Sequence, residues 1–197
     1  MKTFSKITLA AAALALLAIA AASPHGHEAQ GHDSKHSEAR WNTIVIDVAE
    51  DMRTLSANTA SPTDTEPKRG TTAIINGKIY PGGTIAAGDG LDVDMLTGST
   101  GTWISRGTFN FDLSEFVRGA PLLSATQHYL FSPRGALDGE DSLMSEGPEF
   151  GVTTPRVVLG GTGRYRGVIG EVTQETLGFN STGFANFRFT FTIRSAE

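Results

Sequence analysis

The sequence of 197 residues contains no cysteine, and only 19% of its residues are charged. Without a thiol the chain has no disulfide, no thiolate nucleophile and no cysteine-ligated metal site. No segment after residue 22 shows a sustained apolar period of the helical kind, so a parallel sheet with crossover helices is not expected. The fold must therefore depend on packing alone.

Basic residues are outnumbered, with 16 Lys and Arg against 21 Asp and Glu and a net charge of −5. An acidic body disfavours a phosphate backbone as partner, and we expect no nucleic-acid partner. Beyond residue 40 the only histidine is His128, and the Gly-x-Ser-x-Gly elbow is absent. Serine-hydrolase chemistry is therefore not expected, because it needs a nucleophile with a nearby base.

Residues 1–22 are typical of a secretory signal peptide. Lys2 and Lys6 give a positive start, an apolar run covers Ile7 to Ala22, and Ala20-Ala21-Ala22 supplies a small-residue cleavage site. The run of about 16 residues is short for a spanning helix, which needs roughly 20. We predict a secreted protein, periplasmic in a Gram-negative host, whose mature chain starts near Ser23 and has no membrane partner.

Residues 23–40 form a predicted linker that is rich in histidine. It carries His25, His27, His32 and His36 among Gly, Gln, Ser and charged residues, without an apolar period. Such a segment buries too little surface to order itself. Metal capture by the imidazoles is the alternative, but no accompanying ligand spacing defines a geometry, and we predict no metal site.

Residues 41–197 change to alternating and short apolar runs, which indicate β-strands. A polar connection is expected over 55–70 and could cover a barrel mouth. About eight strands without helices predict an all-β fold, a closed eight-stranded antiparallel barrel that leaves no exposed edge. The predicted strands are 43–48, 71–80, 101–112, 124–132, 142–146, 156–159, 165–179 and a last one ending at 194, with 91–95 as a weaker candidate.

Two short motifs lie at predicted turns. Gly160-Gly161-Thr162-Gly163 is interpreted as a tight reversal, because a phosphate cradle would have to lead into a helix. Asn180-Ser181-Thr182 is a glycosylation sequon, and Asn180 would carry a glycan if the source is eukaryotic.

The last strand separates its side chains onto two faces, because neighbours along a strand point in opposite directions. The first interpretation is that the aromatic face fills the barrel and the polar face meets water. The alternative is that the aromatic face is buried in a subunit interface and the polar row lines a pocket. The first face holds Phe187, Phe189, Phe191 and Ile193, and the second Asn186, Arg188, Thr190 and Thr192.

Three residues are candidates for a site. Gln127 and Tyr129 share a strand face, and the Tyr129 hydroxyl could donate to a substrate oxygen, although a core tyrosine bonded to a backbone carbonyl is the plainer interpretation. Asp47 lies within the β-branched run 43–48, where a carboxylate is out of place unless it is paired, protonated or functional. At an edge or solvent-facing position it would be harmless.

The stretch Val157-Val158-Leu159-Gly160-Gly161-Thr162-Gly163-Arg164-Tyr165-Arg166-Gly167-Val168-Ile169-Gly170-Glu171-Val172 resembles the allene oxide cyclase and dirigent-like superfamily of calycin-type barrels. Ser145-Glu146-Gly147-Pro148 and the aromatic strand 187–193 are similar to the same family. The resemblance implies an eight-stranded barrel with an apolar cavity, and a homodimer or homotrimer.

The resemblance also implies a function without a cofactor. Members cyclise an allene oxide or polyketides, or control stereoselective coupling, so the expected partner is a small apolar ligand or substrate. Asp47 looks like the first-strand acid of allene oxide cyclase, whereas Ala49 stands where that enzyme has asparagine, and its reactive-site cysteine has no counterpart. Two alternatives stay open: a non-catalytic carrier barrel, and a structural protein with a filled barrel.

Overall fold

In a computed structural model, eight antiparallel strands form a closed barrel in which each strand pairs with its chain neighbours. The structure describes residues 40–58, 61, 67–112, 123–132, 141–149 and 153–195. The predicted signal peptide and linker lie outside this part, apart from Arg40. The strands are β1 (Asn42–Asn58), β2 (Thr72–Pro81), β3 (Gly101–Phe109), β4 (Leu123–Phe131), β5 (Asp141–Glu149), β6 (Thr154–Thr162), β7 (Val168–Phe179) and β8 (Ala185–Ser195).

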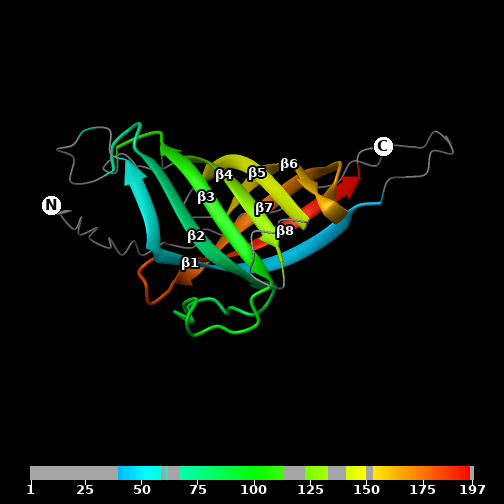
Figure 1. The fold of residues 1–197 in the computed structure, drawn as a ribbon, viewed down its shortest axis with the longest axis horizontal. Helices are drawn as coiled ribbons and strands as arrows, with labels where there is room; N and C mark the ends of the chain where they lie inside the picture. The colour runs from blue at the N-terminus through cyan, green and yellow to red at the C-terminus, as the bar shows by residue number, and fades with distance from the viewer. Residues whose placement is uncertain are drawn as a thin grey trace, which may run out of the picture. The chain divides into compact units, whose positions relative to one another are not determined.

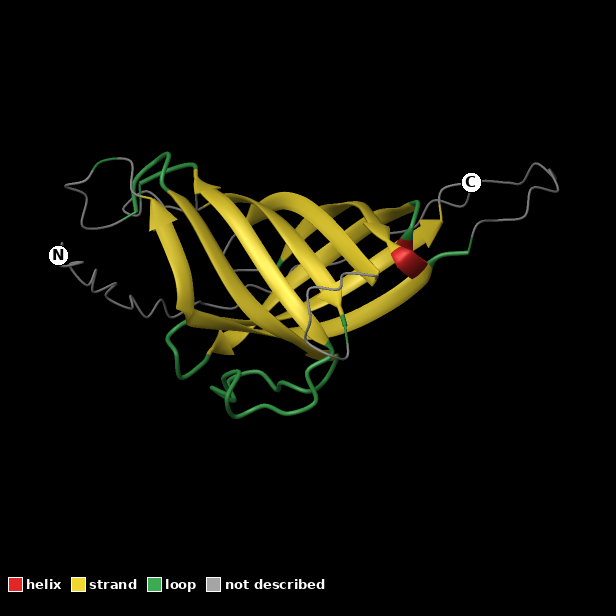
Figure 2. Cartoon of the chain, viewed as in Figure 1, coloured by secondary structure: helices red, strands yellow, loops and turns green. Residues whose placement is uncertain are grey.

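β1 closes the barrel because it pairs on both sides. Ile46 lies opposite Pro81 of β2 and opposite Phe189 of β8. Figure 1 shows blue-to-cyan β1 beside red β8 and teal β2, and Figure 2 shows strands around the whole wall with one short helix, Gly163–Tyr165. The predicted closed eight-stranded, all-β barrel is confirmed.

Two strand predictions were wrong in the N-terminal half of the barrel. β1 continues through a register shift between Asp51 and Ser56 to Asn58, so the start of the predicted polar connection belongs to the strand. The weaker strand candidate 91–95 contains a turn instead. There the Asp92 carboxylate accepts the backbone N–H groups of Asp94 and Met95, at 2.8 and 3.2 Å, in the manner of an Asx turn.

Two more corrections concern glycine and proline. Gly160 and Gly161 belong to β6, and the reversal follows at 163–167, so β7 begins at Val168 rather than Tyr165. The close approach of the chain explains Gly161, since an added Cβ would lie 2.2 Å from the Ser142 carbonyl oxygen. β5 runs on past residue 146 to Glu149 and includes Pro148, which lies opposite Ser124 of β4.

All eight strands contribute to the barrel core, and β8 contributes more of its buried residues than any other strand. Tyr129 of β4 packs edge-on against Phe189 and Phe191, with ring centroids 5.2 and 4.8 Å apart. The interpretation that the aromatic face of this strand fills the barrel is confirmed. The buried side chains of that face are Phe187, Phe189, Phe191 and Ile193, all at most 5% exposed.

A long connection, residues 82–100, folds back over the outside of the barrel; we call it the outer loop. Its Ile85 and Val93 pack on Ala49, Tyr80 and Leu177 as a second apolar cluster. The Gly88 N–H donates to the Leu177 carbonyl at 2.7 Å, which attaches the loop to β7. The loop therefore buries an outward face that would otherwise meet water.

Asp47 anchors this loop from beneath. Its carboxylate is fully buried, forms an ion pair with Arg188 at 2.8 Å, and accepts the Ile85 N–H at 2.9 Å. Arg188 also donates to the Ile85 carbonyl at 3.0 Å. The three groups form a closed polar clamp within apolar surroundings, which gives the buried carboxylate the partners that it needs.

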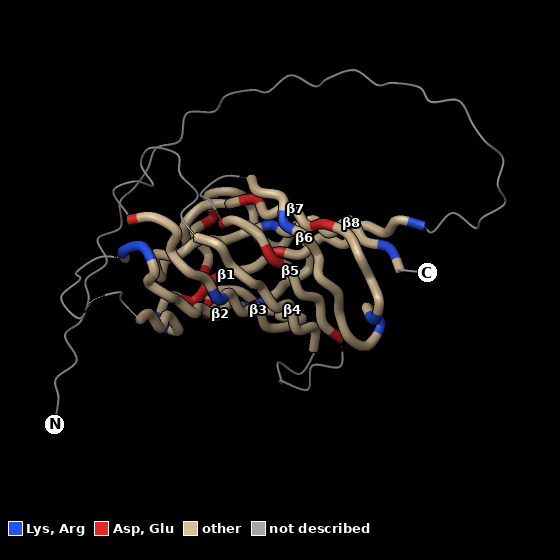
Figure 3. The backbone as a smooth tube through the Cα atoms, turned by 90° about the horizontal axis from the view of Figure 1, so that it is seen from above, with Lys and Arg blue, Asp and Glu red and all other residues tan. Residues whose placement is uncertain are grey.

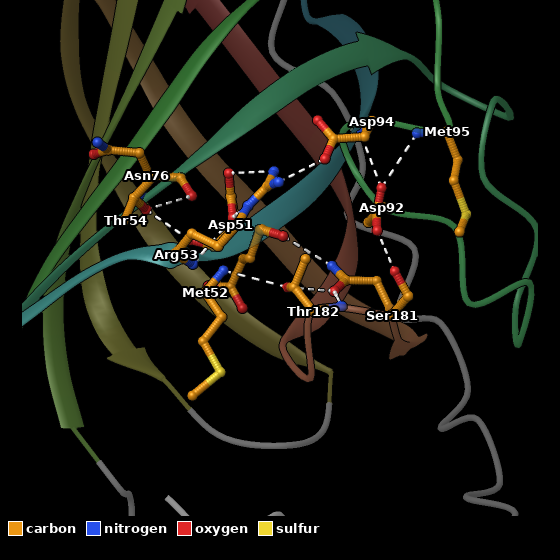
Figure 4. A network of polar contacts seen from close by, with 12 residues as sticks. Asp51, Met52, Arg53, Thr54, Asn76, Asp92, Asp94, Met95, Ser181 and Thr182 are labelled. Carbon is orange, nitrogen blue, oxygen red and sulfur yellow. Dashed lines mark hydrogen bonds and ion pairs between the residues drawn. The ribbon is translucent and has the colours of Figure 1, made fainter. Parts of the chain in front are cut away.

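Figure 4 shows a second attachment of the outer loop, at the β7–β8 turn. Arg53 of β1 donates to Asp51 at 2.7 Å and to Asp94 of the loop at 2.5 Å, while the Ser181 hydroxyl of the turn donates to Asp92. Asn186 reaches from β8 to the Leu91 carbonyl at 2.8 Å. The loop is thus tied to β1, β8 and the turn between β7 and β8.

Figure 3 shows basic and acidic residues scattered along the backbone of the barrel. Among the described residues, no helix has the length and apolar character needed to cross a membrane.

Removal of the buried carboxylate should test the clamp. We expect Asp47→Ala to lower the free energy of unfolding by about 2 to 4 kcal/mol, because Arg188 loses its ion pair and the Ile85 N–H its acceptor. Urea denaturation measures the loss. As control, Arg164→Ala removes an ion pair whose arginine is 65% exposed and should cost less than about 1 kcal/mol. Equal losses in the two variants would contradict the clamp.

Candidate functional site

The interior of the barrel is apolar towards one end and polar towards the other. The polar end is the one at which β5 ends and β6 begins. Polar side chains enter it from β1, β3, β4, β5, β6 and β7, in phase with the core residues of those strands. Its members are Glu50, Ser105, Gln127, Tyr129, Ser145, Glu149, Arg156, Gln174 and Thr176, all buried or partly buried.

Glu149, the last residue of β5, is the centre of this polar end. Its carboxylate accepts from the Gln127 amide at 3.3 Å and from the Ser105 hydroxyl at 3.4 Å. Burial raises the pKa of Glu149, and Arg156 together with these hydrogen bonds offsets part of the rise. The residue as a whole is partly exposed, whereas its carboxyl group is buried.

Gln127 links the acid to the aromatic interior. Its Nε2 donates to Gln174 at 3.0 Å, and its Oε1 accepts the Tyr129 hydroxyl at 2.6 Å. Burial raises the pKa of Tyr129, so the phenol stays protonated and donates. Ser145 lies 3.2 Å from the same phenol oxygen. The chain of bonds orients each amide and hydroxyl of this row.

Arg156 is the buried cation of the group, at 2% exposure. Its guanidinium donates to the carbonyl oxygens of Ala125 at 2.5 Å and Pro148 at 3.0 Å, and to Ser145 at 3.3 Å. Burial lowers its pKa, and Glu149 raises it in part. The donors of Arg156 are thus directed at the barrel wall, which holds the polar end together.

Glu50 of β1 is a second interior acid, at 4% exposure. One carboxyl oxygen accepts the Ala185 N–H at 3.1 Å. Burial and the charge of Glu149 raise the pKa of Glu50 well above its ordinary value. The site therefore combines two acids, of which Glu50 favours its neutral, proton-donating form.

The structure brings together two of the three predicted site residues. Gln127 and Tyr129 point inward and are hydrogen-bonded to each other. Asp47 alternates with the inward residues Ile46 and Val48 and lies on the outer face under the outer loop, away from them. Its place on the outer face follows from the period of two along a strand.

Asn180 does lie in a turn, but its side chain is buried rather than free for a glycan. The amide nitrogen that a glycan would modify donates to the Glu50 carbonyl at 2.8 Å and to Asn186 at 3.1 Å, and the residue is 5% exposed. Its oxygen accepts from Thr182 at 2.6 Å. In the folded chain this amide is thus held within the turn, and glycosylation of the sequon stays a prediction from the sequence.

Sequence reasoning missed Glu50, Glu149 and Arg156. The signal for Glu50 was present, because it continues the alternation of Ile46 and Val48. Glu149 was missed because a strand was expected to stop before Gly147-Pro148. The inward direction of Arg156 needed the pairing of its strand with both neighbours.

Among the described residues no group of three or more His, Asp or Glu is placed to hold a metal ion. Two open hollows, of about 410 and 290 Å³, lie around Gly170 and Glu171. Arg156 also lines the smaller one, and neither is lined by Glu50 or Glu149.

No model of a known protein family matches the sequence, and no curated protein matches it. Solved structures do match. A pterocarpan synthase dirigent protein aligns with a TM-score of 0.57 and 14% identity over 82% of this chain and 99% of its own. A second pterocarpan synthase dirigent protein gives 0.54 and 11% over 88% and 100%.

A pyocyanin demethylase aligns with a TM-score of 0.50 and 14% identity over 77% of this chain and 99% of its own. At these identities the likeness shows the fold, and the predicted dirigent-like barrel is confirmed at that level.

The pKa of Glu50 predicts how stability depends on pH. Because folding raises this pKa, the folded state binds the proton more tightly, so Glu50 stabilises the fold below its unfolded pKa and this contribution is lost as pH rises through the folded pKa. The difference in stability between Glu50→Gln and the parent chain should therefore grow, in favour of Glu50→Gln, as pH rises from 4 to 8. Urea midpoints at both values measure this. The exposed Glu171→Gln should show no such change with pH, and an equal change in both variants would contradict the prediction.

The buried amide of Asn180 gives another prediction. Asn180→Ala should lose about 2 to 3 kcal/mol of unfolding free energy, because it leaves the Glu50 carbonyl without its donor. Thermal or urea unfolding measures the loss. The folded protein from a eukaryotic secretory host should have the unmodified peptide mass at this residue; a glycan on folded, soluble protein would refute the buried placement.

Proposed function

We propose that this barrel binds a small, largely apolar molecule inside its polar end and directs cyclisation, isomerisation or stereoselective coupling of that molecule without a cofactor. The observation that carries the proposal is Glu149, an enclosed acid on a partly exposed residue, connected through Gln127 to an aromatic interior. The similar solved barrels support it, because their names, pterocarpan synthase and pyocyanin demethylase, refer to small molecules. We also propose that the chain is exported by residues 1–22.

The proposed reaction depends on how the barrel positions its substrate, and it needs no covalent bond between substrate and protein. The aromatic wall around Phe187, Phe189 and Tyr129 would hold the apolar body of a flexible substrate in one conformer. Glu149 and Glu50 would donate and accept protons during the reaction and would stabilise charge that develops on the substrate, in a site with little water. Gln127 holds the Glu149 carboxylate in place.

Identification of a natural ligand is the first test. We expect native mass spectrometry of the mature protein from its own secretion medium to show a mass excess that disappears on denaturation, and the released molecule to be largely apolar. A barrel that carries nothing, and also excludes the neutral apolar dye Nile red, would favour a structural protein with a filled interior. A bound molecule that the protein never converts would favour a carrier.

Once such a molecule is known, the role of the acid can be measured. Glu149→Gln keeps the shape of the side chain but removes its ionisable carboxyl group, and should reduce turnover by about 100-fold or more. Glu146→Gln is the matched control on the outer, exposed side of β5 and should keep full turnover. Turnover that survives Glu149→Gln unchanged would exclude the acid from the reaction.

A further inference from the structure

The polar end contains unpaired hydrogen-bond donors beside the network around Glu149. Gln174 is 1% exposed, and its Nε2 has no hydrogen bond within the described part of the chain. Gln174 lies close enough to Glu149 to favour its charged form, but completes no hydrogen bond to it. Two residues further along β7, the buried Thr176 hydroxyl also has no partner there. Buried polar atoms of this kind are rare and require an explanation.

Glu50 adds a third donor on the same side of the barrel. Its strand β1 pairs with β8, and β8 pairs with β7, so Glu50, Gln174 and Thr176 enter from neighbouring parts of the wall. One Glu50 oxygen accepts from the Ala185 N–H. In its neutral form the carboxyl carries one proton to donate, and burial together with Glu149 favours that form.

The amide oxygens at this end already accept hydrogen bonds. The Gln174 oxygen accepts from Gln127, and the Gln127 oxygen accepts from Tyr129. The buried cation Arg156 directs its donors at carbonyl oxygens of the wall and at Ser145. A ligand carboxylate would thus approach two interior acids and a committed arginine, and would lose its hydration without a free cation.

From this arrangement we infer that Glu50, Gln174 and Thr176 form a subsite for an uncharged hydrogen-bond acceptor, so that the ligand is a neutral ring compound with a carbonyl or similar oxygen, and anionic analogues are rejected. The inference rests on the proposed interior site and names the class of molecule that the site takes. The ring body packs on the aromatic side chains, and the oxygen points to the polar end.

The experiment uses three tricyclic probes of similar shape: fluorene without an acceptor, fluorenone with one carbonyl, and fluorenone carboxylate with an added charge. Equilibrium dialysis at pH 7 against the full mature chain gives each Kd. Fluorenone should bind at least about tenfold more tightly than fluorene, because it supplies an acceptor to buried donors. Fluorenone carboxylate should bind at least about tenfold more weakly than fluorenone.

Substitutions in β7 test whether its side chains cause the preference for fluorenone over fluorene. Thr176→Val and Gln174→Leu should each reduce the preference for fluorenone over fluorene by several-fold while fluorene binding is kept. Thr173→Val, on the outer face of the same strand, is the matched control and should leave the preference unchanged. The Trp41→Phe background leaves Trp103 as the single tryptophan of the chain, and quenching of its emission confirms that the probe is inside.

The outcomes separate the two proposals. Binding of fluorene and fluorenone with equal affinity, or tightest binding of the carboxylate, overturns the acceptor subsite while an interior site remains. Failure of all three probes to bind or to quench Trp103 overturns the interior site itself. A tenfold preference that persists in both β7 variants places the recognition elsewhere and also overturns the assignment.

Discussion

Closure of the barrel through β1 is the constraint on which the rest of the structure depends. Because β1 pairs with β2 on one edge and β8 on the other, each of its residues has to face either the interior or the outside. Ile46, Val48 and Glu50 face inward, and Asp47 and Ala49 face outward. The same short segment therefore supplies a core, an interior acid and the anchor of the outer loop.

The outward face of β1 explains why the outer loop is ordered without secondary structure of its own. A buried carboxylate in an ion pair, with a backbone N–H as a further donor, holds the loop at Ile85, and the Asp92 and Asp94 side chains hold it near the β7–β8 turn. Apolar residues of the loop then cover Tyr80 and Leu177. Burial of Tyr80, with Asp92 and Asp94 nearby, raises the pKa of its phenol to about 12. Polar anchors fix the position, and apolar contact supplies most of the stabilisation.

The inward faces of the strands combine aromatic and polar side chains in one small interior, because a small barrel has room for only a few side chains of each kind. Aromatic rings from β8 pack on Trp103 and Tyr129, and polar groups lie beside them towards the end at which β5 ends and β6 begins. Burial raises the pKa of both interior acids, Glu50 and Glu149, and the charge of Glu149 adds to the rise at Glu50. Acids with pKa values shifted by burial are enriched at sites that bind or react.

The sequence by itself determined the fold class and the number of strands, because alternation and turn residues are local properties of the chain. It also determined that Phe187, Phe189 and Phe191 share one face, and that Gln127 and Tyr129 share another. It did not determine that Asp47 lies outside, that the Asn180 amide donates to the Glu50 carbonyl, or that Glu50, Glu149 and Arg156 all enter the polar end. Those facts depend on which face of each strand is turned inward and on which strands close the ring, and only contacts between residues far apart in the chain decide both.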